Sequence, residues 1–463
     1  MHYISTRGKG PPLPFCETVL TGLARDGGLF LPSQIPDVRG RLPDWSRLSY
    51  ADLAYELFRL YAADIPAPDL RSLVDRSYAV FRHPEVTPVV AVGPLHILEL
   101  FHGPTLAFKD VALQFLGNLF EYVLARTGGE LNIVAATSGD TGSAAIQGIR
   151  GRAHIRIFVL HPHGRVSPVQ ERQMTTVLDA NVRNLAVDGT FDDCQRIVKE
   201  LFNDLAFRDR HHLGAVNSIN WARVLAQIVY YFYAAFRVME RTGAKRVRFS
   251  VPTGNFGDIF AGYLAYRMGL PIDRLVLATN ENDILTRFFQ TGIYEKGKVV
   301  STLSPSMDIQ VSSNFERYLF YRAAEDTRQV CAWMDSFQRT NRLEIPMPTD
   351  AAIIVAGRGD TAATLDTIRA YWAQHRYLLD PHSAVGVHVA AAHLNPAAPM
   401  ICLATAHPAK FGDAILRATG EALAHHPILD ALAALPTRSV RLPAERAAIA
   451  AFVDESIRGV TAT

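Results

Sequence analysis

Near the N-terminus, apolar residues recur with the period of a helix. Within residues 49–62, Leu53, Leu57 and Leu60 follow one another at intervals of three and four residues, and residues 69–81 continue in the same style. This spacing places the leucines on one face of a helix. The pattern predicts a helix-rich segment at the start of the chain.

From about residue 95 the pattern changes to short apolar runs followed by helical stretches. Such units occupy residues 130–150, 184–204, 245–269, 273–289, 351–374 and 399–420; a further strand is expected at 153–164 and one long helix at 220–240. Strands that alternate with helices predict parallel sheets with helices on both faces. We therefore expect an α/β fold with two open parallel-sheet domains after the helical segment.

The long helix near residue 240 separates two stretches of this alternation, so we expect a domain boundary there. The predicted division has three parts: a helix-rich domain at 1–92, a smaller α/β domain at 93–240 that contains Lys109, and a larger α/β domain at 241–463 that contains the turn at 254–257.

Composition narrows the class of protein. The 463 residues are 49% hydrophobic and 20% charged, as in a soluble globular protein with more than one core. A net charge of +2 gives no sign of a nucleic-acid partner, and no window approaches the ~18 apolar residues of a membrane span. The first residues form no secretory signal, and the four scattered cysteines are typical of a reducing compartment. We therefore expect a cytoplasmic protein.

The turn within residues 136–145 is the first candidate for chemistry. Thr137, Ser138 and Thr141 carry hydroxyl groups, and Gly139 lets the backbone approach a ligand. Ligands of open α/β sheets bind where strands open into helices, and a helix N-terminus suits an anion such as a carboxylate. An ordinary capped helix explains this turn equally well.

Two further turns follow strands. Residues 254–257 form a compact glycine-bearing turn that can bind a phosphate through backbone N–H groups, although it matches neither the dinucleotide nor the P-loop fingerprint. A plain strand-to-helix turn without a ligand explains residues 254–257 equally well. At the end of a later strand, Thr405 can offer its hydroxyl to a ring nitrogen. The HPHG sequence at 161–164 has no acidic or cysteine partner nearby, so we expect no metal site.

Lys109 is the ninth residue of the stretch FHGPTLAFKD, at the start of a predicted helix. Leu113, Leu116 and Phe120 follow it at helical spacing. The positive end of the helix dipole and partial burial both favour a neutral amine, which can form a Schiff base and carry protons. Taken alone, the lysine is better explained as one that extends into solvent.

Taken together, FHGPTLAFKD, ATSGDTGSAA, VPTGNFGDIFAGY and LATAHPAKF resemble the threonine synthases of the long bacterial and fungal type, in this order and spacing. FCETVLTGLARDGGLFLP, NSINWARVLAQIVYYF and SPSMDIQVSSNFERYLF agree, so the resemblance runs from about residue 3 to about residue 420. It implies the tryptophan synthase β-like fold type II of pyridoxal phosphate (PLP) enzymes. The implied reaction is γ-elimination and β-hydration of O-phospho-L-homoserine to L-threonine and phosphate, the last step of threonine biosynthesis, by a monomer or homodimer.

The resemblance also implies a role for each motif. Lys109 would form the Schiff base with PLP, with Phe108 packed near the ring, and Thr405 would face the pyridine nitrogen. The cofactor phosphate would be bound by Gly254, Asn255, Phe256 and Gly257. The substrate would be bound at its carboxylate by Thr137, Ser138, Gly139 and Thr141, and at its phosphate by Asn217, Ser218 and Arg223.

Asp140 departs from the wider fold relatives, which commonly have an asparagine here. An aspartate cannot donate a hydrogen bond unless it is protonated. We place Asp140 in the substrate site without assigning its contact, and leave open the roles of His102, Asp110 and the last forty or so residues.

Three other functions remain open from the sequence. A related PLP phospho-lyase would use the same motifs but release a 2-keto acid. A serine or threonine dehydratase would not need the second anion site around Arg223. A binding protein without catalysis would not need Lys109. No regulatory domain is evident at the N-terminus.

Overall fold

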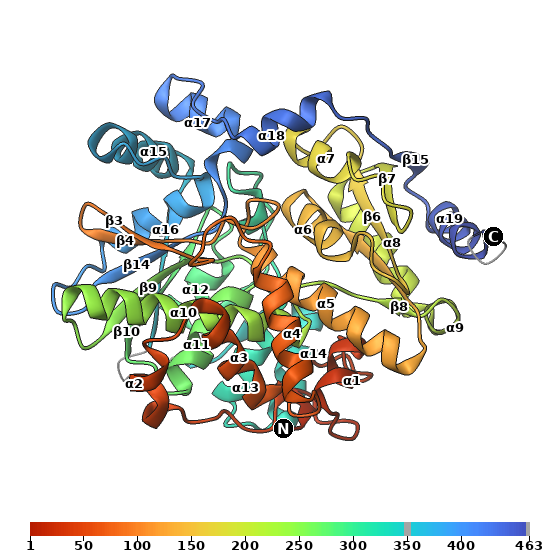
Figure 1. Ribbon diagram of the computed structural model, residues 1–463, viewed down its shortest axis with the longest axis horizontal. Coiled ribbons are helices and arrows are strands. Elements are labelled where there is room, and N and C mark those ends of the chain that lie inside the picture. The colour runs from red at the N-terminus through yellow and green to blue at the C-terminus, as the bar shows by residue number, and fades with distance from the viewer. Residues whose placement is uncertain (347–352, 460–463) are drawn as a thin grey trace. The chain divides into compact units, whose positions relative to one another are not determined.

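The computed structural model describes residues 1–346 and 353–459, in which the chain forms two units (Figure 1). Both units are discontinuous in sequence. Unit 1 comprises Met1–Val19, Leu23–Ala112 and Ser218–Ala424, and unit 2 comprises Leu20–Gly22, Leu113–Asn217 and His425–Thr463. The breaks therefore fall near residues 112, 217 and 424. The domains expected at 1–92, 93–240 and 241–463 were drawn in residue order, and that division remains a proposal.

Unit 1 contains a six-stranded sheet that is parallel except for its last pair. Its order is β13 (Ile354–Arg358), β10 (Ile272–Thr279), β9 (Val247–Pro252), β14 (Met400–Ala404), β4 (Leu95–Glu99) and β3 (Val89–Val92). Only β3 runs antiparallel to its neighbour. β13 is the strand expected within 351–374, whose first two residues lie outside the described part of the chain.

Helices cover both faces of this sheet. Alternate residues of a strand point to opposite faces. The Phe249 ring of β9 contacts Tyr231 of α10 (Trp221–Thr242), with centroids 4.8 Å apart. The next residue, Ser250, donates its hydroxyl to the Gly386 carbonyl of α16 (Pro381–Ala391) at 2.6 Å. α10 and α16 therefore lie on opposite faces.

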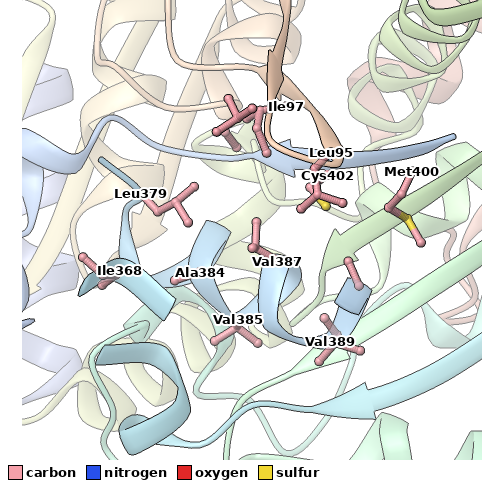
Figure 2. Close-up of a cluster of buried hydrophobic side chains, with 14 of the residues drawn as sticks. Leu95, Ile97, Ile368, Leu379, Ala384, Val385, Val387, Val389, Met400 and Cys402 are labelled. Carbon is pink, nitrogen blue, oxygen red and sulfur yellow. The ribbon is translucent and has the colours of Figure 1, made fainter. Parts of the chain in front are cut away.

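A buried apolar cluster lies between the sheet and α16. Figure 2 shows Met400 and Cys402 of β14 together with Val385 and Val387 of α16. Strand residues two apart point to one face of the sheet, so Met400 and Cys402 share this cluster. Val385 and Val387 do not lie on one stripe of α16; both are in the cluster because α16 is buried on nearly all sides. Ile368 of α15 (Thr361–His375) packs into the same cluster.

The remaining elements of unit 1 surround this sheet. Two short antiparallel pairs are β1 (Tyr3–Ser5) with β2 (Phe30–Pro32), and β11 (Ile293–Glu295) with β12 (Arg342–Glu344). The other helices are α2 (Leu42–Trp45), α3 (Tyr50–Tyr61), α4 (Ala67–Tyr78), α11 (Gly257–Arg267), α12 (Ile284–Thr291), α13 (Phe315–Arg322), α14 (Thr327–Thr340) and α17 (Gly412–Thr419). Helix α1 (Phe15–Thr21) and helix α5 (Lys109–Thr127) each have residues in both units.

Unit 2 contains a five-stranded, fully parallel sheet. Its order is β15 (Val440–Pro443), β7 (Val182–Asp188), β6 (Ile155–Pro162), β5 (Leu131–Ala136) and β8 (Leu213–Gly214). One face packs its apolar residues against α8 (Phe191–Asn203) and α19 (Arg446–Arg458). The other helices are α6 (Asp140–Ile149), α7 (Pro168–Thr175), α9 (Leu205–Arg210) and α18 (Pro427–Ala431).

The predicted α/β fold with two parallel sheets is confirmed. The N-terminal helices expected near 49–62 and 69–81 are α3 and α4. Among the described residues, no helix has both the length and the apolar character needed to cross a membrane.

Candidate active site

The stretch that ends in Lys109 is fixed against the carboxyl end of β14. The N–H of Phe108 donates to the carbonyl of Thr405 at 2.8 Å, and the N–H of His407 donates to the carbonyl of Leu106 at 3.0 Å. Lys109 begins α5 and is only 7% exposed, and its Nζ lies 4.6 Å from the centre of the Phe108 ring. Two of the predicted motifs therefore meet in unit 1.

Asp110 orders the turn before Lys109. Its Oδ2 accepts the N–H of Thr105 at 2.7 Å, and its Oδ1 accepts the Thr105 hydroxyl at 2.8 Å. The ammonium of Lys410 donates to the Thr105 carbonyl at 2.9 Å. Burial raises the pKa of Asp110 to about 6, although these hydrogen bonds and the charge of Lys410 oppose the rise. The Asp110 carboxylate thus holds the backbone of the turn at Thr105 in place.

His102 takes part in a separate network at the end of β4. Its Nε2 lies 2.8 Å from an oxygen of Glu99, and the other oxygen of Glu99 accepts the Tyr377 hydroxyl at 2.8 Å. The His102 carbonyl accepts the N–H of Arg82 at 3.0 Å. These contacts hold the chain between β4 and the Lys109 turn.

The turn at 254–257 links β9 to α11. Phe256 adopts the left-handed conformation, with φ of 62°. A Cβ on Gly254 would lie 2.8 Å from the Ser306 carbonyl oxygen and 3.2 Å from the Cα of Met307, so only glycine fits without moving backbone. The first N–H groups of α11 have no partner within the helix. Such N–H groups can bind an anion, so the phosphate-binding role expected of this turn stays a prediction.

This turn is supported by a polar segment within the SPSMDIQVSSNFERYLF motif, to which the sequence analysis gave no role. The Asn255 carbonyl accepts the N–H of Asn314 at 3.0 Å, and its side-chain oxygen accepts the Ser313 hydroxyl at 3.2 Å. The Ser313 hydroxyl lies 3.2 Å from that of Ser218. Ser218 is thereby joined to the turn through Ser313.

Arg317 anchors the segment that contains Ser313 and Asn314. It is fully buried, donates to the carbonyls of Phe30 at 3.0 Å and Ile219 at 2.6 Å, and also bonds the side chain of Asn314. Burial lowers its pKa to about 9. Its only signal in the sequence was membership of the SPSMDIQVSSNFERYLF motif, because a charged residue is ordinarily expected at the surface.

Arg223 supplies a second buried cation in unit 1. It lies in the first turn of α10, where its N–H donates to the carbonyl of Asn220 at 3.0 Å, and it is 3% exposed. Burial lowers its pKa to about 10, so it stays charged at neutral pH. A guanidinium in such a poorly solvated place attracts an anion more strongly than one in water does.

The turn at 137–141 lies in unit 2, between β5 and α6. The hydroxyl oxygen of Thr137 accepts the N–H groups of Gly139 at 3.0 Å and Gly142 at 2.8 Å, so it caps the helix. Ser138 and Thr141 are half-buried. Asn217 is exposed and is also in unit 2.

Asp140 is held by Gln170 of α7. Its Oδ1 accepts the Gln170 amide at 2.8 Å, and the Ser167 hydroxyl donates to the Gln170 side-chain oxygen at 3.0 Å. Gly139 has φ of 141°, and a Cβ there would lie 2.6 Å from the Gln170 side chain. Gln170 therefore fixes both the carboxylate and the glycine of this turn.

Family models cover nearly the whole chain. Residues 2–78 match "Threonine synthase N terminus", residues 80–345 match "Pyridoxal-phosphate dependent enzyme", and residues 383–453 match "Threonine synthase, C-terminal". The last of these includes much of the C-terminal segment for which the sequence analysis assigned no role.

Individual proteins are similar over the same length. A threonine synthase of Schizosaccharomyces pombe is 50% identical over 453 residues, covering 89% of this chain and 88% of that protein. One from Pseudomonas aeruginosa is 46% identical and covers 98% of each. A crystal structure of PLP-bound threonine synthase from Brucella melitensis superposes with a TM-score of 0.95 at 46% identity, covering 99% of this chain and 100% of that one.

Proposed function

Because the chain belongs to the threonine synthase family, we propose that it converts O-phospho-L-homoserine and water into L-threonine and phosphate with bound PLP. The position of Lys109 carries this proposal. Its buried amine lies beside the end of β14, and its charge acts on Asp258, the residue that follows the turn at 254–257. An amine and a phosphate-binding turn in one neighbourhood are what a phosphorylated aldehyde requires.

The residues of unit 1 fit the cofactor. Lys109 supplies the amine for the aldehyde, residues 254–257 and the first turn of α11 supply N–H donors for the phosphate, and Thr405 supplies a neutral hydroxyl for the ring nitrogen. Phe108, in contact with Lys109, would pack near the ring. When bound, PLP bonds to an amine and accepts the electrons released as neighbouring C–H bonds break.

The chain's own residues then bind the substrate and move protons. Lys109 takes protons up at Nζ and returns them. Arg223, Ser218 and Asn217 bind the substrate phosphate, and the buried guanidinium of Arg223 stabilises the charge that grows as phosphate leaves.

The turn in unit 2 is assigned to the substrate carboxylate. Ser138 and Thr141 offer hydroxyl groups, and Gly139 begins the N-terminus of α6, which suits an anion; the Gly139 N–H itself is donated to Thr137. Thr137 shapes the turn by capping it, and Asp140 keeps it rigid through Gln170.

We further propose a cytoplasmic enzyme that is a monomer or a homodimer. In support of a reducing compartment, none of the four cysteines, all within the described residues, forms a disulfide. Light scattering of the purified protein at several concentrations decides between the two assembly states.

Replacement of Lys109 tests the function. The purified wild-type protein should show a visible absorption band from lysine-bound PLP, release phosphate from O-phospho-L-homoserine and form threonine in equal amount. Lys109→Ala should lose this absorption band, and its turnover rate should fall by more than about a thousandfold, because the amine is needed for both.

Lys199→Ala, at an exposed position of α8, is the matched control and should keep band and turnover. Accumulation of 2-oxobutyrate in place of threonine would identify the phospho-lyase instead. Full turnover by Lys109→Ala would overturn the assignment of the amine.

A further inference from the structure

Asp380 is a buried carboxylate to which neither the motifs nor the proposed function gives a role. It is the N-cap of α16 and is 1% exposed. Its side chain accepts the N–H groups of His382 at 2.9 Å and Ser383 at 3.3 Å, and so caps the helix. A cap alone does not require burial, and acidic residues are rarely buried unless they are paired. The further contacts of Asp380 therefore indicate what else the group does.

One oxygen of this carboxylate is linked to the end of β14. The Ser383 hydroxyl donates to Oδ2 of Asp380, and its oxygen accepts the N–H of Thr405 at 3.1 Å. Hydrogen bonds that follow one another in this way strengthen each other. The carbonyl of Thr405 in turn accepts the N–H of Phe108, the residue before Lys109. The strand end that is expected to meet the ring nitrogen is thus tied to Asp380.

The other oxygen is linked to the segment beside the turn at 254–257. Nδ1 of His382 lies 2.9 Å from Oδ1 of Asp380, and Nε2 of His382 accepts the N–H of Ser306 at 3.2 Å. Because Nε2 accepts, the ring proton is on Nδ1 and is donated to Asp380. The Ser306 carbonyl faces Gly254 closely enough that a Cβ there would lie 2.8 Å from its oxygen. Asp380 is therefore connected to this turn through two residues.

The side chains that make both links are held rigidly. Asp380, His382 and Ser383 are each at most 3% exposed, and the His382 ring packs on Phe411 with centroids 5.0 Å apart. Both links begin at one carboxylate in the first turn of α16. They therefore set how far the end of β14 lies from the segment that supports the turn at 254–257.

The spacing of these two places matters for a ligand such as PLP. Its ring nitrogen and its phosphate belong to one rigid ring system, so a site for it must present partners for both at a set separation. Residues that bind a ligand keep such a geometry only when other hydrogen bonds hold them in place.

We propose that Asp380 is a positioning residue that sets the spacing between the two ends of the cofactor site. Through Ser383 it holds Thr405 for the ring nitrogen. Through His382 it holds the segment against which the turn at 254–257 packs. This role rests on the proposed function, in which Thr405 and that turn bind PLP.

Three ligands separate the two ends of the site. They are PLP, 1-deaza-PLP, which has a C–H in place of the ring nitrogen, and pyridoxal, which lacks the phosphate. Calorimetric titration of the full-length protein freed of PLP gives a dissociation constant for each. The ratio of 1-deaza-PLP to PLP measures the nitrogen preference, and the ratio of pyridoxal to PLP measures the phosphate preference.

Asp380→Ala should reduce both preferences by about three- to tenfold, because each end loses a hydrogen-bonded support. A general loosening of the fold would weaken the three ligands alike and leave both ratios unchanged, so the ratios report positioning. Ratios equal to those of the wild type, or a fall in only one of them, would overturn the proposal.

Variants of the two links should divide the effect. Ser383→Ala should lower the nitrogen preference and keep the phosphate preference. His382→Phe keeps a ring against Phe411 and loses both nitrogen contacts, so it should lower the phosphate preference alone. The opposite pattern would contradict the two links.

Asp326→Ala is the matched control for loss of the cap. Asp326 caps α14 by accepting the N–H groups two and three residues later, as Asp380 does for α16, but it is exposed. Both ratios should equal those of the wild type. A fall in this variant as large as that in Asp380→Ala would assign the effect to helix capping and overturn the proposal.

Asp380→Asn decides the question if Asp380→Ala does not fold. Asparagine still caps a helix, but its amide has one acceptor oxygen where the carboxylate has two, so at least one ratio must fall. Two unchanged ratios would overturn the proposal. A wild type without either preference would refute the cofactor assignment itself, whereas strong wild-type preferences that both Asp380 variants retain would refute only the role of Asp380.

Discussion

Asp110 lies fully buried at the second position of α5, where burial raises the pKa of its carboxyl group from 3.8 to about 6 against the hydrogen bonds from Thr105. The folded protein therefore keeps a proton on Asp110 at pH values where the unfolded chain has released it. Stability then falls as the pH rises from about 4 to about 6. A shift of about two units corresponds to about 3 kcal/mol.

Asp110→Asn should remove this part of the pH dependence, because an amide does not ionise. Urea unfolding at pH 4, 5, 6 and 7 should give a free energy of unfolding that falls less steeply in the variant than in the wild type. The same replacement at Asp192, an exposed position of α8, is the control and should leave the slope unchanged. A slope that is identical in all three proteins would show that Asp110 ionises normally.

The sequence predicts where a single residue lies in an element, but not which side chains it contacts. The position of Lys109 at a helix start follows from the apolar spacing after it, and the structure places it there. The contacts of Asp110, Asp140 and Asp258 do not follow from spacing. Asp140 and Asp258 have partners on other elements, such as Gln170 for Asp140, and the contacts of Asp110 depend on how the preceding loop brings Thr105 back to it.

At the scale of elements, the turn at 254–257 depends on a segment fifty or so residues later in the chain. The Ser306 carbonyl and Met307 approach Gly254, and Ser312 bonds the Gly254 carbonyl. The apolar run of β9 and the helical stretch after the turn predict these two elements, which are buried at nearly every position. It does not predict residues 304–314, because their order comes from polar contacts and not from a repeating pattern.

Gly254→Ala tests the fit of this turn. The added Cβ would lie 2.8 Å from the Ser306 oxygen, which is backbone and cannot turn aside, so the turn and the segment must separate. We expect PLP to bind about ten- to a hundredfold more weakly, measured by titration of the visible band, with the fold retained by circular dichroism.

Gly40→Ala is the control for this change, because nothing lies within 4 Å of a Cβ at Gly40. It should bind PLP as the wild type does. Equal affinity in Gly254→Ala would mean that the turn does not hold the cofactor phosphate.

At the scale of the whole molecule, unit 2 is assembled from three segments that are distant in sequence. β15 lies at the edge of its sheet and pairs with β7, with Val440 opposite Leu185. Ile449 and Val453 of α19 are fully buried among Cys194 and other apolar residues of unit 2. The last part of the chain, for which the sequence predicted no role, therefore completes this core. Long-range pairing of this kind leaves no local signal.

Ile449→Ala should accordingly destabilise unit 2. Removing a fully buried isoleucine side chain leaves a cavity and costs about 3 kcal/mol. Hydrogen exchange should show the loss as faster exchange of the amides of β6, β7 and β15, since those strands share the core with α19. Leu416→Ala removes a comparable side chain that is 50% exposed on α17 of unit 1, and it should cost less than about 1 kcal/mol. Equal losses of stability in the two variants would show that α19 is not part of the core that supports the turn before α6. Unchanged hydrogen exchange in β7 of Ile449→Ala would show the same.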